Sequence, residues 1–152
     1  MSEVKKIVHE RFKSTPAELG FRMPAEWERH EATWLVWPHR LSDWPGKFAP
    51  IPWVYGEIVR RLAMVERVRI LVASAAHEAR ARRILTRLGV ASDQVEFLPF
   101  PTDRGWSRDM GPIFIRRRDP KAEKAEVAIA RFRFNGWARF PDWKQDDQVS
   151  ND

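Results

Sequence analysis

The sequence predicts an α/β fold, because apolar runs typical of covered strands alternate with segments of helical spacing. Residues 68–73 form a continuous apolar run interrupted only by Arg69, as expected for a strand covered on both faces. A helical stripe follows, with apolar residues three or four positions apart: Ala81, Ile84, Leu85 and Leu88. With 152 residues, the chain has about the size of one ordinary domain.

Before that run, the sequence predicts a strand at residues 33–37, ended by Pro38. The loop 38–52 contains four proline residues and one glycine, so turns rather than backbone ladders are expected to order it. A helix is predicted to begin near Pro52, with an apolar stripe at Val54, Ile58, Leu62 and Val65.

After the run, Ser74 is the predicted N-cap of a second helix that Gly89 ends. Strands are predicted at residues 95–100, 113–117 and 126–134, and the last one alternates between two faces. A hairpin loop is expected to open at residues 119–120, and residues 135–136 end the alternating strand. Asp146 and Asp147 are the predicted cap of one more helix.

The composition is that of a globular protein, with 43% hydrophobic and 32% charged residues. No apolar run approaches the roughly 20 residues that cross a bilayer, so no membrane association is expected. There is no cysteine, and residues 1–13 have no signal-peptide core, so a cytoplasmic location is expected. Residues 1–20 are interpreted as a flexible lead-in and residues 21–152 as one domain or part of one.

The net charge of +6 raises the alternative of a partner that is a polyanion. The basic residues concentrate on the second helix and at the end of one strand: Arg80, Arg82, Arg83, Arg87, Arg116, Arg117 and Arg118. An ordinary solvated surface explains them, and no nucleic-acid partner is expected. A non-catalytic basic module, binding through this helix and the hairpin, is kept as the alternative function.

Metal and nucleotide chemistry find no support in the sequence. The four histidines, His9, His30, His39 and His77, are scattered without ligand spacing, and no metal site is expected. The seven glycines form no phosphate-binding pattern. We therefore expect no cofactor.

The segment 101–114 concentrates the residues that could bind a planar cation. Trp106 and Asp109 stand three positions apart and offer ring stacking and charge-assisted hydrogen bonds, the two contacts that a guanidinium prefers. Arg108 is expected to pair with a carboxylate, and residues 111–112 to fix the loop exit. The alternative is that Asp109 and Arg108 only stabilise a turn. Trp44, Trp106 and Trp137, beside Pro and Gly, are candidates for lining a pocket.

Several separate stretches, in the same order, resemble the agmatine deiminase and Porphyromonas-type peptidyl-arginine deiminase family of the guanidino-group-modifying superfamily. Residues 23–30 (MPAEWERH) and 33–38 (TWLVWP) resemble its N-terminal signature, and residues 106–112 (WSRDMGP) its Trp-x-Arg-Asp-x-Gly-Pro motif. Residues 134–137 (FNGW), with the acidic pair at 146–147, resemble a further motif.

This resemblance implies a pseudo-fivefold α/β propeller of ββαβ units, of which the chain would cover roughly the first two. It also implies hydrolysis of a guanidinium group, with release of ammonia, through a Cys thiolate, a His acid and base, and two clamping carboxylates. The expected substrate is agmatine or peptidyl arginine, and assembly into a homo-oligomer is left open.

By the motif match, Asp109 is one clamping carboxylate and Trp106 a wall of the substrate pocket. Asp103, Arg108, Asn135 and Trp137 are expected in or beside the same pocket.

The sequence departs from the family pattern in three respects. The absence of cysteine means that no catalytic nucleophile is present, so the Cys and the His-x-Asp motif are expected beyond residue 152 and the chain alone is expected to be inactive. Arg104 stands where many relatives carry a second Asp, and Ala138 replaces a common Gly.

Overall fold

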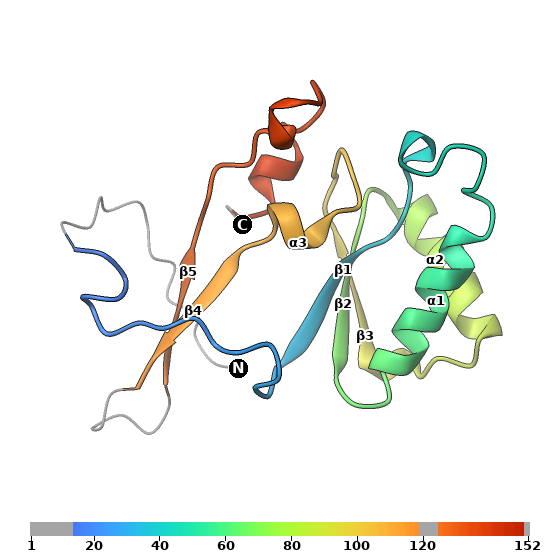
Figure 1. Ribbon diagram of the computed structural model, residues 1–152. Helices are drawn as coiled ribbons and strands as arrows, with labels where there is room; N and C mark the ends of the chain where they lie inside the picture. Colours follow the sequence, from blue (N-terminus) through green and yellow to red (C-terminus); the bar gives the residue numbers. More distant parts are fainter. Residues whose placement is uncertain (1–13, 119–124, 151–152) are drawn as a thin grey trace. The chain divides into compact units, whose positions relative to one another are not determined.

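The computed structural model describes residues 14–118 and 125–150 (Figure 1). The chain divides into two compact units, Met1–Arg29 with Pro112–Phe132, and His30–Gly111 with Arg133–Asp152. The first contains an antiparallel hairpin and the second a parallel sheet with its helices. The predicted α/β class is therefore confirmed.

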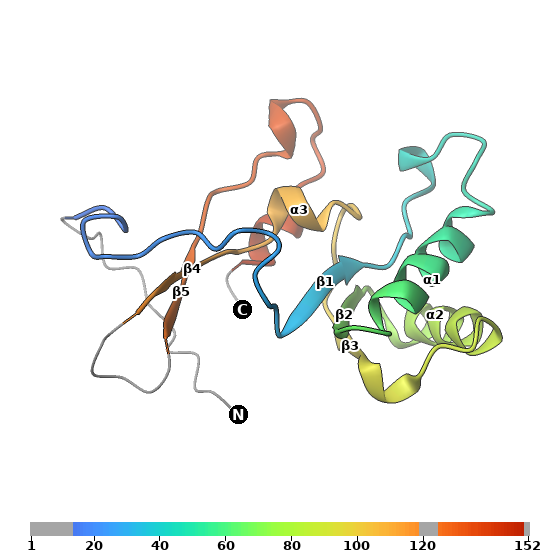
Figure 2. The same ribbon diagram turned by 60° about the horizontal axis from the view of Figure 1, so that its bottom comes forward.

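The larger unit contains a three-stranded parallel sheet in the order β1-β2-β3 (Figures 1 and 2). Its strands are β1 (Ala32–Val36), β2 (Arg67–Val72) and β3 (Val95–Pro99). The helices α1 (Ile51–Leu62) and α2 (Ala75–Arg87) connect them. All three strands were predicted within one or two residues of their ends.

The central strand β2 is covered on both faces, as its apolar run predicted. Val68, Ile70 and Val72 alternate along the strand and join the cluster beneath α1 and α2, which includes Trp37, Val59, Ala81 and Leu85. Leu71 points to the other face, where it packs with Val36 and Met110. The two faces thus bury two separate clusters, and the second one supports the loop that follows β3.

The buried face of α1 differs from the predicted one. Val54 and Ile58 are 51% and 41% exposed, and Val65 lies beyond the end of the helix. The buried residues are Gly56 and Val59, because α1 packs closely against α2: a Cβ on Gly56 would lie 2.6 Å from Leu88 Cδ1. Tyr55, Val59 and Leu62 form the apolar stripe that packs on the core, so Leu62 was predicted correctly, whereas Val54 and Ile58 were each predicted one residue too early.

The second helix agrees with its prediction. The Ser74 side chain accepts a hydrogen bond from the His77 backbone N–H at 3.2 Å and caps the helix. Ala81 and Leu85 are buried, and Gly89 follows the helix with a φ of +69° that favours glycine.

The smaller unit contains the antiparallel strands β4 (Ile113–Arg117) and β5 (Glu126–Ala130). The predicted strand 126–134 was too long, since pairing ends where Ala130 faces Ile113, the first residue of β4. Ala128 is the buried side chain of β5, whereas Val127 and Ile129 are exposed, which confirms the alternation there. The predicted hairpin loop at 119–120 lies outside the described residues, as do residues 1–13 of the predicted lead-in.

Two short segments also correct the prediction. The expected loop after β3 contains one helical turn, α3 (Ser107–Met110). The helix expected after Asp146 and Asp147 is, within the described residues, a single 3-10 turn, Asp146–Gln148, that contains both aspartates. They do not cap it, because their side chains bind other parts of the chain. Among the described residues, no helix has both the length and the apolar character needed to cross a membrane.

Candidate functional site

The candidate site lies where the chain leaves the carboxyl ends of the parallel strands, the usual position of ligand sites in open α/β sheets. Pro38 and His39 follow β1, His77 begins the helix after β2, and Thr102 follows β3. A hydrogen bond joins the segments that follow β1 and β3: His39 Nε2 lies 2.9 Å from the Thr102 carbonyl oxygen. The parallel topology thereby gathers residues that are about 60 positions apart in the sequence.

Two histidines meet at this edge, with ring centroids 5.6 Å apart in an edge-to-face arrangement. His77 Nδ1 accepts from the Ala73 N–H, so its Nε2 carries the proton and donates to the Pro38 carbonyl at 3.4 Å. Burial lowers the pKa of His77, which agrees with this neutral form. His39 faces two carbonyl oxygens, of Trp37 and Thr102, and a neutral ring donates to only one of them.

The indole of Trp106 forms one wall of a narrow recess. It lies 5.7 Å from the Trp44 ring at a tilt of 32°, and both line the recess with His39, Arg40 and Asp43, among others. Trp106 is half-buried, so its aromatic face is only partly occupied by protein. Trp44 and Trp106 thus both border this recess, whereas Trp137 does not.

Asp109 lies on α3, the single helical turn that directly follows Trp106, and packing and hydrogen bonds fix the position of this turn. Met110 is 3% exposed and packs into the cluster of Val36 and Leu71, and its carbonyl accepts from Ser150 Oγ at 2.8 Å. A Cβ on residue 111 would lie 2.5 Å from the Ser107 carbonyl oxygen, so the turn requires Gly111. These contacts therefore hold the turn in a single conformation.

The carboxylate of Asp109 is exposed and, among the described residues, has neither a hydrogen-bond nor an ion-pair partner. It does not line the Trp44–Trp106 recess, although the backbone of Asp109 bonds the Trp106 carbonyl at 3.1 Å. A fixed, unpaired carboxylate beside an aromatic wall can accept a cation without first breaking an internal ion pair. Arg108 lies exposed on the same turn.

Arg104, by contrast, is internal. It is 7% exposed, and its guanidinium bonds Asp43 at 2.5 Å and Asp142 at 2.9 Å while it lies 4.0 Å from the Phe140 ring centroid. Arg40 completes the network at Asp142. The hydrogen bond from Arg104 lowers the pKa of Asp142. Sequence reasoning missed this network, since its partners are 38 and 61 residues from Arg104.

The acidic residues near the chain's end hold loops together. Asp146 is fully buried, and its Oδ1 accepts from the backbone N–H groups of Asp103 and Arg104 at 2.7 and 3.2 Å. Burial raises the pKa of Asp146 to about 6, against the opposite effect of these two hydrogen bonds. Asp103 in turn accepts from the Gln145 N–H at 2.8 Å, so its carboxylate is engaged within the protein.

Asn135 and Trp137 belong to a strained turn. Three consecutive residues, Gly136, Trp137 and Ala138, have φ of +63°, +57° and +54°. Asn135 Oδ1 accepts from the Ala138 N–H at 3.2 Å, and Trp137 packs edge-on against Phe134 at 5.0 Å between ring centroids. Neither residue lines the Trp44–Trp106 recess.

The polyanion alternative receives little support from the charges. In the smaller unit, Arg116 pairs with Glu28 and Arg117 with Glu126, and on α2 Arg82 pairs with Glu78. The other arginines of α2, Arg80, Arg83 and Arg87, form no ion pair with any described residue. Within the part of the chain that is described, no three His, Cys, Asp or Glu side chains are grouped as a metal site would require.

Taken together, the parallel α/β unit carries a loop at the edge of its sheet that presents two paired indoles and, among the described residues, an unpaired carboxylate. The family model of Porphyromonas-type peptidyl-arginine deiminase matches residues 22–152. The chain therefore belongs to this family, as its motifs indicated.

Relatives and solved structures agree with that assignment. The chain is 34% identical over 143 residues to the agmatine deiminases of Pseudomonas aeruginosa and Ectopseudomonas mendocina, a match that covers 90% of this chain and 36% of each relative. It superposes on the agmatine deiminase of Enterococcus faecalis with a TM-score of 0.74 and 25% identity, over 91% of this chain and 36% of that one. The chain thus spans about a third of the length of the relatives it matches.

Proposed function

We propose that this chain supplies the substrate-clamping part of a hydrolase that acts on a guanidinium group and releases ammonia. The observation that carries the proposal is the unpaired, exposed carboxylate of Asp109 on a turn fixed by Met110 and Gly111. Its membership in a family of guanidinium hydrolases supports the reaction class.

The geometry required of a guanidinium site explains the two main residues. The planar cation presents parallel N–H groups, which a carboxylate accepts as a pair, and weakly hydrated faces that stack on aromatic rings. Asp109 would accept the N–H groups, and Trp106, paired with Trp44, would cover one face. Held in this way, the guanidinium carbon is positioned and kept electrophilic for attack.

The other proposed residues act less directly. Asp103 and Arg104 are engaged with Gln145, Asp43 and Asp142, and we assign them to holding the loop that bears Trp106. Asn135 and Trp137 form the neighbouring strained turn, and Arg108 lies beside Asp109. Each of these residues would act on the substrate only through the shape of the pocket.

Turnover requires a nucleophile, and the sequence contains no cysteine. In the proposed reaction a Cys thiolate adds to the guanidinium carbon, and a His transfers protons as ammonia leaves and water enters. No thiolate comes from these 152 residues, and we propose that the catalytic His does not either, so we expect the chain alone to be inactive. We further propose that residues 21–152 form the N-terminal part of a deiminase domain built as a pseudo-fivefold propeller, in a cytoplasmic and possible homo-oligomeric enzyme.

Agmatine is the proposed substrate, because the similar proteins of Pseudomonas aeruginosa and Enterococcus faecalis are named for deimination of that molecule. Peptidyl arginine presents the same guanidinium and is the competing substrate. Peptidyl arginine differs from agmatine at the end of the aliphatic chain opposite the guanidinium, where it carries backbone amides and agmatine carries a primary amine.

The test measures binding by calorimetry on the 152-residue chain. Agmatine should bind, and putrescine should bind more weakly because it lacks the planar guanidinium. A blocked arginine amide stands in for peptidyl arginine, and its affinity relative to that of agmatine tells the two candidate substrates apart. Asp109→Asn should weaken agmatine binding by roughly tenfold or more, as expected from the loss of a charge-assisted hydrogen bond.

Asp93→Asn is the matched control, because Asp93 is an exposed carboxylate on a distant 3-10 turn and its loss changes the net charge equally. If both variants bind agmatine equally well, Asp109 is not part of the site. Ammonia release from agmatine by the chain alone, abolished by Asp109→Asn, would keep the clamp but contradict the proposed inactivity.

A further inference from the structure

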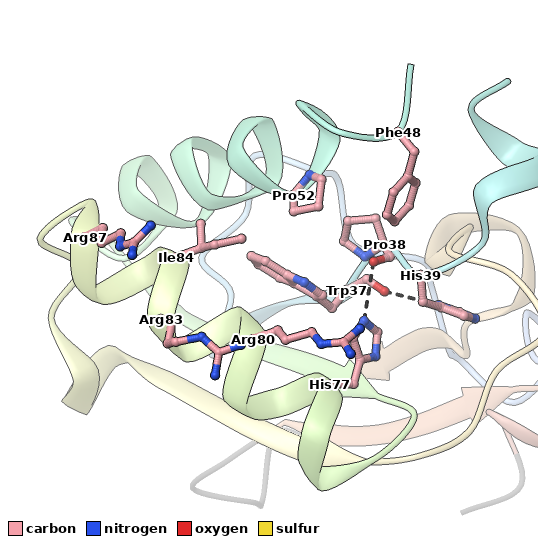
Figure 3. Close-up of a pocket in the computed structure, with 10 residues that line it drawn as sticks. All are labelled: Trp37, Pro38, His39, Phe48, Pro52, His77, Arg80, Arg83, Ile84 and Arg87. Carbon is pink, nitrogen blue, oxygen red and sulfur yellow. Dashed lines mark hydrogen bonds between the residues drawn. The ribbon is translucent and has the colours of Figure 1, made fainter. Parts of the chain in front are cut away.

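A second pocket lies on the helical side of the parallel sheet and differs in character from the Trp44–Trp106 recess. Its volume is about 350 Å³, within the range of about 300–1,000 Å³ typical of small-molecule sites. Figure 3 shows the Trp37 ring between α1 and α2, with Arg80 and Arg83 extending from α2.

The floor of the pocket is apolar and rigid. Trp37 is 2% exposed and belongs to the buried cluster beneath the helices. Ile84, Phe48 and Pro52 complete the apolar lining. Phe48 and Ile84 are half-buried, so they offer apolar surface on which a ring of a ligand could pack above Trp37.

The rim of the pocket is cationic. Arg80, Arg83 and Arg87 recur at intervals of three and four residues, so they share one face of α2. No acidic side chain is among the residues that line the pocket. Within the described residues these three arginines form no ion pair, whereas Arg82, on another face of the helix, is paired with Glu78 at 2.7 Å.

This distribution needs an explanation beyond solubility. Like charges three or four positions apart on a helix repel one another and cost stability. Arg87 lies in the last turn, where the helix dipole favours a cation, but Arg80 and Arg83 lie further toward the N-terminus, where it does not. A bound anion would relieve this repulsion, and guanidinium groups bind carboxylate and phosphate oxygens in pairs.

We propose that this pocket binds an aromatic oxyanion, a flat apolar group that carries a phosphate or a carboxylate. The ring would pack on Phe48 and Ile84, above the buried Trp37, and the oxyanion would bond Arg80 and Arg83 at the rim. The proposal is independent of the guanidinium hydrolysis above, because a cationic rim repels a guanidinium compound. Pro38 and His39 line this pocket and the Trp44–Trp106 recess alike, so an occupant would lie next to the candidate site.

The probe is 1-naphthyl phosphate, titrated into the 152-residue chain by calorimetry in Tris buffer. Saturable binding is expected, and the double variant Arg80→Gln with Arg83→Gln should weaken it about tenfold or more, given what bonds to charged groups contribute. Arg82→Gln is the matched control and should bind within about twofold of the parent. 1-Naphthol and inorganic phosphate should each bind at least about tenfold more weakly, because each supplies half of the contacts.

Four outcomes would overturn the proposal: no saturable binding of 1-naphthyl phosphate, equal binding of 1-naphthol, an equal loss in Arg82→Gln, or displacement of the probe by agmatine. A short oligonucleotide could also displace the probe. If its binding is weakened as much by Arg82→Gln as by the double variant, the arginines form a polyanion surface and the proposal of an aromatic oxyanion pocket is overturned. Circular dichroism verifies that the double variant remains folded, and if it does not, Arg83→Gln alone carries the test.

Discussion

The two units of the chain differ in how they are stabilised. In the larger unit, a parallel sheet buries one cluster against α1 and α2 and a second against the turn of α3, and an internal ion-pair network ties its loops. In the smaller unit, the two-stranded hairpin buries Ala128 but exposes Phe114, Val127 and Ile129, and its arginine pairs lie at the surface. A two-stranded sheet has little stability of its own in water.

This difference matters for function because the candidate guanidinium loop belongs to the larger unit. Met110 inserts into the second cluster, so the turn that presents Asp109 inherits the rigidity of the sheet. A binding group held on such a scaffold loses little conformational entropy when its ligand arrives. The hairpin has no comparable anchor among its described residues.

The largest expected effect comes from the ion pairs of the two units. Arg104→Ala should destabilise the chain by about 3–5 kcal/mol, because it leaves the buried carboxylate of Asp43 without its cation, while Asp142 keeps its pair with Arg40. Arg117→Ala removes an exposed pair with Glu126 and should cost about 1 kcal/mol or less. Urea denaturation followed by far-UV circular dichroism measures both. An equal loss of unfolding free energy in the two variants would contradict the difference between the internal ion pairs of the larger unit and the surface pairs of the smaller one.

A second comparison uses the same residue type in both units. Ile70→Ala should cost about 2–5 kcal/mol, because Ile70 is fully buried in the cluster beneath the helices. Ile129→Ala should cost about 0.5 kcal/mol or less, since that side chain is 38% exposed on the hairpin. If the second substitution is as costly as the first in urea denaturation, the hairpin contains a core that its exposure does not reveal.

Asp146 predicts a pH dependence within the larger unit. Its pKa is raised in the folded state from 3.8 to about 6, so the folded chain binds the proton more tightly than the unfolded chain. The contribution of Asp146 to stability should therefore be largest below the unfolded pKa and should decline as the pH rises through the folded pKa, after which it stays constant. Asp103 and His39 are the titratable neighbours of this carboxylate.

Asp146→Asn tests that prediction, because the amide oxygen can still accept from the Asp103 and Arg104 N–H groups while the charge is removed. The variant should gain stability relative to the parent at pH 7.5 and lose this advantage at pH 4, with thermal unfolding as the measurement. A variant that is less stable than the parent at pH 7.5 would contradict the attribution of the pKa to burial.

The smallest expected effect concerns the strained turn. Ala138→Gly should stabilise the chain by up to about 1 kcal/mol, because a left-handed conformation costs an L-residue about 1–2 kcal/mol and glycine about half that in entropy. Ala79→Gly, in the middle of α2, is the control and should destabilise by about 1 kcal/mol. The same sign for both substitutions in urea denaturation would show that Ala138 is not strained.

Sequence reasoning worked best where a signal is local. The run at 68–73, the cap at Ser74 and the stop at Gly89 each gave the right element, because burial and capping depend on neighbouring residues. It was one residue early along part of the buried face of α1, with Val54 and Ile58 in place of Tyr55 and Val59, and it did not mark Gly56, which allows a close helix contact without a hydrophobic side chain.

The candidate site shows the same division. The motif identified Trp106 and Asp109, since their chemistry is visible within four residues. The partners of Arg104 and the loop-holding role of Asp146 were not visible, because they join segments 38 to 61 residues apart for Arg104 and about 40 for Asp146. Asp103 was expected near the substrate, but its carboxylate binds the Gln145 N–H, which only the folded chain brings close.

The most direct test of the guanidinium site observes the indole N–H signals of the eight tryptophans by ¹⁵N-resolved NMR as agmatine is added. The account predicts shifts confined to Trp106 and Trp44, together with the backbone signal of Asp109, and their loss in Asp109→Asn. Trp34 and Trp53, outside the recess, serve as internal controls. Shifts at those controls with none at Trp106 would contradict the account and place the cation elsewhere on the chain.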